Sequence, residues 1–100
     1  MNQAELTTYT ADFSHLARTT QLVREGGIRA FLLHLGASEE MPEHQVKGPI
    51  TVQCLQGAVL FSTAEESVEL ISGSLISLPG RVPHSLVARR ASLMLVTVCE

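Results

Sequence analysis

The sequence has little positive charge and few cysteines, and both shortages narrow what it is expected to bind. Its seven Lys and Arg residues leave a formal net charge of −3, and Arg89-Arg90 is the one adjacent basic pair. Because binding to a phosphate backbone requires a basic patch or stripe, we expect no nucleic-acid partner. Cys54 and Cys99 lie in separate apolar runs, without the spacing of a zinc knuckle or a redox pair. We expect two free thiols, buried or half-buried, in a reducing compartment.

Long apolar runs are also missing. Stretches such as AFLL and LMLV are far shorter than the roughly 20 residues of a membrane-spanning helix, so no membrane partner is expected. The segment MNQAELTTYTADF has no cationic part followed by an apolar one, so we expect no signal peptide. With 45% apolar and 17% charged residues, the composition is that of a globular chain. We therefore predict a soluble, cytoplasmic protein with one folded domain.

Strand signals dominate from residue 20 onward, as runs of β-forming residues separated by glycine, proline and polar turns. The predicted strands are residues 20–25, 28–35, 50–56, 58–63, 67–71, 75–78, 84–88 and 92–98. Between them, the polar segment 38–49 contains two prolines and is expected to be mostly loop or irregular edge. Short strands spaced about ten residues apart predict an all-β antiparallel sandwich or barrel over residues 20–100. Residues 1–19 would form an N-terminal arm.

Two stretches of this chain carry a recognisable family pattern. GASEEMPEHQVKGPITVQCLQGAV contains His44 and Gly57, and GSLISLPGRVPHSLVA contains Gly73, Pro79 and His84. In order and spacing these stretches resemble the two motifs of small cupins, over residues 27 to 98. The resemblance implies the RmlC-like jelly roll, an antiparallel double-stranded β-helix closed into a barrel.

The same resemblance implies a metal site that is incomplete in this chain. With Gly57 as the anchor, Val46 and Ile50 stand where the family has its second histidine and its glutamate. Arg81 stands at a usual glycine, and Ala88 at a usual asparagine. His44 and His84 remain as candidate ligands for a divalent metal such as Zn, Fe, Ni or Mn. Because such ions normally take at least three side chains, a third ligand would have to come from His34, Gln53, Glu43 or water.

Strand alternation predicts where His84 points. His84, Leu86 and Ala88 share one face of their strand, while Ser85, Val87 and Arg89 share the other. Since the charged face should meet water, His84 is expected to point into the barrel. We predict that His44 and His84 converge on one cavity, and that Val46, Ile50, Leu86 and Ala88 line it.

Three side-chain positions stay open at this stage. Both faces of residues 28–35 are mostly apolar, so the direction of His34 is undecided. Gln53 faces outward if Ile50 faces inward, unless a bulge near Pro49 reverses the alternation. A register with one extra residue would place Glu43 and Gln45 at the paired-histidine positions. His15 is expected at the surface.

Two classes of function fit these observations. In the first, the barrel binds a small-molecule ligand in a mostly apolar cavity, oriented by His44 and His84. The alternative is a metal-dependent cupin enzyme of the dioxygenase or isomerase type, with the two histidines as metal ligands. The outward faces of residues 28–35 and 92–98 hold many large apolar side chains. We therefore also predict a two-fold symmetric homodimer, with Leu6, Tyr9 and Phe13 of the arm spaced to cover apolar surface.

Overall fold

In the computed structural model, residues 1, 3–6 and 19–100 are described, and within them seven strands make up one antiparallel sheet. The strands are β1 (Thr19–Glu25), β2 (Ile28–Leu35), β3 (Glu40–His44), β4 (Ile50–Thr63), β5 (Ser67–Ile71), β6 (Leu75–Leu78) and β7 (His84–Cys99). Neighbouring strands are hydrogen-bonded in the order β1-β2-β7-β4-β5. In addition, β3 pairs with β7 and β6 pairs with β4. The predicted all-β antiparallel fold is confirmed.

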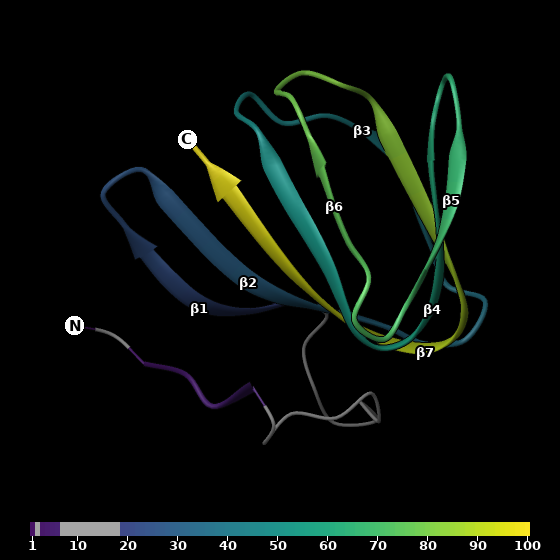
Figure 1. Ribbon diagram of the computed structural model, residues 1–100, viewed down its shortest axis with the longest axis horizontal. Coiled ribbons are helices and arrows are strands. Elements are labelled where there is room, and N and C mark those ends of the chain that lie inside the picture. The colour runs from purple at the N-terminus through teal and green to yellow at the C-terminus, as the bar shows by residue number, and fades with distance from the viewer. Residues whose placement is uncertain (2, 7–18) are drawn as a thin grey trace.

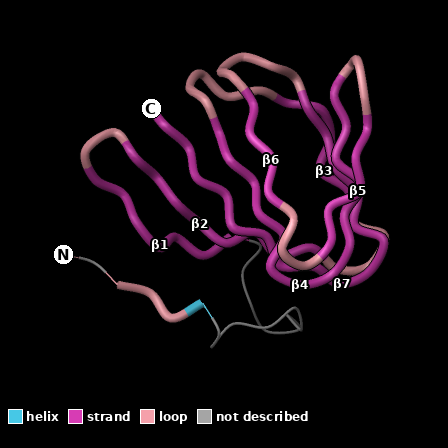
Figure 2. Tube along the Cα trace, in the orientation of Figure 1, coloured by secondary structure: helices cyan, strands magenta, loops and turns pink. Residues whose placement is uncertain are grey.

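The two longest strands bend, and their bends fold the sheet into two facing layers (Figures 1 and 2). The first part of β4 pairs with the last part of β7, with Ile50 opposite Val98, and Thr63 at the other end of β4 lies opposite His84. One layer therefore carries β1, β2 and β6, and the other carries β3 and β5 (Figure 1). The predicted strand list is wrong here, because 50–56 and 58–63 form one strand, as do 84–88 and 92–98.

Gly57 marks the bend of β4 and has a φ of 100°, a conformation that other residues rarely adopt. A Cβ atom at this position would lie 2.2 Å from Ser92 Oγ and 2.6 Å from the carbonyl oxygen of Ala91. The Ser92 hydroxyl holds the corner, since it accepts a hydrogen bond from the Ala58 amide (3.1 Å) and donates one to the Arg90 carbonyl (2.7 Å). The glycine thus bends a continuous strand, with irregular register on both sides, instead of ending it.

Strand β3 lies inside the segment that was predicted to be mostly loop or irregular edge. It pairs with β7, with Glu40 opposite Val87 and His44 opposite His84. Its register shifts between Met41 and His44, a stretch that contains Pro42. Because proline donates no backbone hydrogen bond, this residue is tolerated only at such an irregular, singly paired strand. Of the two alternatives predicted for this segment, loop or irregular edge, these five residues form the irregular edge.

The core lies between the two layers. It is built from inward-facing aliphatic residues of β2, β4, β5 and β7, together with Phe61, Met94 and Cys54. Cys99, at the end of β7, is exposed, contrary to the expected burial of both thiols. The described residues include no helix long and apolar enough to cross a membrane. His15, Tyr9 and Phe13 lie outside the described residues, as does most of the predicted arm.

Candidate functional site

His44 and His84 face each other across neighbouring strands. They are directly paired in the β3–β7 register, and their ring centroids lie 4.4 Å apart in an edge-to-face arrangement. Phe61 of β4 also stacks on His84, with ring centroids 5.4 Å apart and an interplanar angle of 15°. The structure thus brings together two histidines that are forty residues apart in the sequence, because β3 and the start of β7 are partners in one layer.

Each histidine is oriented by a local backbone carbonyl. His84 Nδ1 lies 2.9 Å from the carbonyl oxygen of Val82, and His44 Nδ1 lies 3.2 Å from that of Pro42. A carbonyl oxygen only accepts hydrogen bonds, so Nδ1 carries the proton in both neutral rings. Nε2 is then a hydrogen-bond acceptor in both, and neither Nε2 atom has a hydrogen-bond partner among the described residues. Two acceptor nitrogens are therefore available side by side.

The two rings differ in their exposure to water. His84 is buried, with 5% of its surface exposed, whereas His44 is exposed at the edge of the site. Burial lowers the pKa of His84 below its ordinary value of 6.5, and nearby His44 lowers it further, while the hydrogen bond to Val82 opposes this shift. His84 is consequently neutral at neutral pH, which keeps its Nε2 an acceptor.

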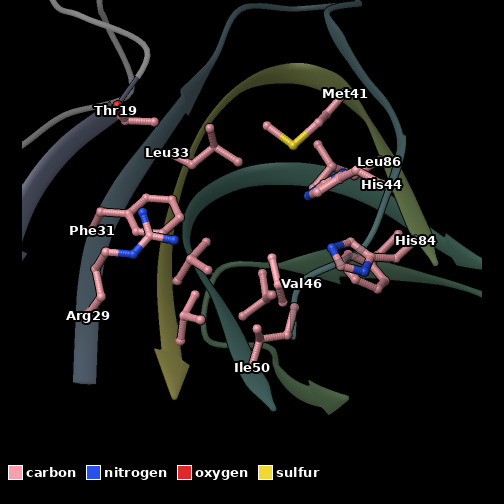
Figure 3. Close-up of a pocket in the computed structure, with 14 residues that line it drawn as sticks. Thr19, Arg29, Phe31, Leu33, Met41, His44, Val46, Ile50, His84 and Leu86 are labelled. Atoms are coloured by element: carbon pink, nitrogen blue, oxygen red, sulfur yellow. The ribbon is translucent and has the colours of Figure 1, made fainter. Parts of the chain in front are cut away.

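The histidine pair closes one side of a cavity of about 250 Å³ between the two layers (Figure 3). Its walls are almost entirely apolar, and they come from β1, β2, β3, β4, β7 and the turn before β4. The lining residues other than the histidines are Thr19, Arg29, Phe31, Leu33, Met41, Val46, Ile50, Val52, Phe61, Leu86, Val96 and Val98. A concave apolar site with few polar groups is the common form of a small-molecule site.

Most of the residues predicted to line this cavity are placed there, and one is not. Val46, Ile50 and Leu86 line it together with both histidines. Ala88 is buried in the core at 1% exposure and is not among the lining residues. That part of the prediction is wrong.

None of the three side chains proposed as a third metal ligand lines the cavity beside the histidine pair. His34 is buried on the opposite face of β2, where its Nε2 lies 3.3 Å from the Thr20 hydroxyl. Gln53 follows the regular alternation of β4 and does not line the cavity that Ile50 and Val52 line. Glu43 is exposed and does not line it either. Residues 50–53 pair regularly with β6, without a bulge after Pro49, and His44 rather than Glu43 lies opposite His84.

The donor set of the described residues therefore does not suit a protein-held metal of the usual kind. No group of three or more His, Cys, Asp or Glu side chains comes together in this part of the chain. Two imidazoles with acceptor nitrogens fall one side chain short of the three that zinc or catalytic iron normally takes.

Arg29 and Phe61 were missed by the sequence analysis. Arg29 shares a strand face with Phe31 and Leu33, and all three line the cavity. That alternation was visible in the sequence, but both faces of β2 are apolar, so the inward face was not identifiable. Phe61 gave no such signal, because its stacking on His84 depends on how β4 bends.

No protein-family model and no curated protein matches the sequence. Many solved structures, however, are similar to it. A cupin superfamily protein from Desulfitobacterium hafniense has a TM-score of 0.77 and 16% identity, with 81% of this chain and 74% of that chain covered. A conserved protein of unknown function from Streptococcus pyogenes has a TM-score of 0.76 and 26% identity, with 82% and 72% covered.

A larger protein shows the same likeness over part of its length. Salicylate 1,2-dioxygenase from Pseudoaminobacter salicylatoxidans has a TM-score of 0.76 and 20% identity, with 81% of this chain but 24% of the dioxygenase covered. Two further similar structures are RmlC-like cupins from Desulfovibrio desulfuricans and Shewanella frigidimarina. The bent β4 and β7, the facing layers and these likenesses agree, and residues 19–100 have the jelly-roll fold that RmlC-like cupins share.

Proposed function

We propose that this protein binds a small, largely apolar molecule in the barrel cavity, with His44 and His84 fixing its orientation. The observation that carries the proposal is the cavity itself: about 250 Å³ of apolar-walled space, bordered by two imidazoles whose Nε2 atoms are acceptors. An apolar cavity of about 150 Å³ is enough for a benzene molecule, so this one has room for a ring or short chain with a substituent.

The two kinds of lining group have different roles in this proposal. Burying the apolar body of a ligand against Phe31, Phe61 and Leu86 supplies roughly 25 cal/mol per Å² of affinity. The two Nε2 acceptors select ligands that carry a hydroxyl or amide donor at the end near His84. Because an unmatched buried acceptor costs about 1–3 kcal/mol, a ligand without a donor should bind more weakly.

An NMR titration with benzyl alcohol tests the proposal. In ¹⁵N-labelled protein we expect saturable shifts confined to cavity residues, and weaker binding of toluene, which lacks the hydroxyl. Val46→Phe fills the cavity and should abolish the shifts. Val68→Phe is the matched control, since Val68 is also half-buried against the core but does not line the cavity. Absence of saturable shifts in the unmodified protein would refute the proposal.

The second candidate is a metal-dependent enzyme of the dioxygenase or isomerase type. The close pairing of His44 and His84 and the fold shared with a salicylate dioxygenase support it. The shortage of a third side-chain donor counts against it. Metal analysis of protein purified without an affinity tag separates the candidates. Stoichiometric Zn, Fe, Ni or Mn that is lost in His44→Ala would favour the enzyme.

A further inference from the structure

Arg29 stands between the cavity and a second hollow beside it. Arg29, Val46 and Val98 line both spaces. We call the second hollow, of about 580 Å³, the basic vestibule, because its charged side chains are mostly cationic. Besides the three shared residues, it is lined by Arg24, Gln45, Lys47, Gly48, Cys99 and Glu100.

The charge of the vestibule is the reverse of that of the whole protein. Three residues with cationic side chains, Arg24, Arg29 and Lys47, line it together with one acidic residue, Glu100, while the chain as a whole carries a formal charge of −3. A concave surface with an excess of one sign attracts ligands of the opposite sign and raises their local concentration. This hollow therefore favours an anion.

The guanidinium of Arg29 is positioned to serve both spaces. Its Cζ atom lies 5.1 Å from the centroid of the Phe31 ring, which is itself a cavity wall. Figure 3 shows Arg29 and Phe31 on one side of the cavity and His84 on the other. Arg29 Nε is also 3.5 Å from a carboxylate oxygen of Glu100, in an ion pair whose two side chains are partly exposed. The chain thus already places one carboxylate against this guanidinium.

We infer that the ligand is a small organic carboxylate: its apolar body fills the cavity and its carboxylate pairs with Arg29 at the vestibule. On binding, the ligand's carboxylate replaces that of Glu100 as the partner of Arg29, which a solvent-exposed pair permits at little cost. Arginine suits this role because its planar fork accommodates a carboxylate in a bidentate manner. The inference rests on the proposed binding function and adds the chemical class of the ligand.

The test compares two probes of equal shape, phenylacetate and phenylacetamide, by NMR titration in low salt. We expect phenylacetate to bind about fivefold or more tightly than phenylacetamide, and the preference to shrink as salt is added. In the Arg29→Gln variant the two probes should bind with equal affinity. Glu100→Gln removes the competing carboxylate and should tighten phenylacetate binding, a gain that no purely structural role of the pair predicts.

Arg89→Gln is the matched control. Arg89 also forms a partly exposed ion pair, 3.4 Å from Glu69, but it lines neither hollow. This variant should keep the preference for phenylacetate. Equal binding of the two probes, or a preference that survives Arg29→Gln, overturns the carboxylate inference while benzyl alcohol binding upholds the proposed function. If none of the three probes binds, both the function and this inference are overturned.

Discussion

His84 illustrates how one buried side chain links the site to pH. The folded chain holds its ring away from water, so burial lowers its pKa, whereas the unfolded chain leaves the ring near the ordinary value of 6.5. His34, buried on the outer face of β2, has its pKa lowered in the same way. As the pH falls through 6.5, the unfolded chain takes up protons that the folded chain resists. The free energy of unfolding therefore falls with the pH, and the decline ends below the folded-state pKa values.

We predict from this that the protein is less stable at pH 5.5 than at pH 7.5, and that His84→Gln makes the difference smaller. His34→Gln should remove a separate share, because the two rings lie on opposite faces of the sheet and couple weakly. Urea unfolding of the three proteins at both pH values, followed by circular dichroism, measures the effect. A stability that rises toward pH 5.5, or a pH dependence unchanged by both substitutions, would contradict the prediction.

At this scale the sequence identified the histidines but not the polar group opposite them. His84 was recognisable because its strand alternates cleanly between charged and apolar faces. Arg29 was not, because Leu32 and Leu33, on opposite faces of β2, are both fully or almost fully buried. Arg81 has a φ of 66°, which explains why the family pattern places a glycine there. The residue type alone did not reveal whether the backbone conformation was kept.

The strands of this protein were more predictable than their ends. Glycines and polar turns marked most of them, yet Gly57 looks the same in the sequence whether a strand ends or bends there. The bend is decided by a contact between distant residues, the approach of Gly57 to Ala91 and Ser92 on β7. For β3 the sequence did not decide between a loop and an irregular edge, for a related reason. Its pairing depends on β7, while its own composition, with Pro42 and two glutamates, is that of a loop.

The corner predicts a specific difference between two glycines. Gly57→Ala should lower the free energy of unfolding by about 3 kcal/mol, for two reasons. The added methyl group would clash with the backbone and with Ser92, and alanine would have to adopt an unfavourable positive φ. Gly73→Ala is the matched control, since Gly73 has a similar φ of 94° but no atom within 4 Å of the added carbon. Gly73→Ala should lower the free energy of unfolding by only about 1 kcal/mol, which is the cost of the positive φ alone. Equal costs in urea unfolding would show that the close approach at the corner contributes nothing.

As a whole molecule, the jelly roll leaves several strand edges open and part of its outer surface apolar. Strands β1, β3, β5 and β6 each pair with only one neighbour among the described strands. The outer faces of β2 and β7 expose less apolar surface than expected, because their Leu32 and Leu93 side chains are fully buried. Two large apolar residues of this layer remain exposed. Ile28 lies beside a shallow hollow of about 280 Å³ that includes Pro49, Thr97 and Cys99, and Leu75 lies on β6, which pairs with β4.

We expect this outer face to pair with the same face of a second copy, giving a two-fold symmetric homodimer. A chain of 100 residues buries a thin core, so covering Ile28 (47% exposed) and Leu75 (63% exposed) adds burial that the monomer lacks. Both strands, β2 and β6, belong to the same layer, so the two side chains can enter one isologous interface.

Sedimentation velocity at micromolar concentration should give a dimer mass, and the pair of substitutions Ile28→Glu and Leu75→Glu should give a monomer. Ile71→Glu changes an equally exposed residue (54%) on β5 of the other layer and should leave the dimer intact. A monomeric unmodified protein would rule out the dimer, and dissociation by Ile71→Glu alone would move the interface to the other layer.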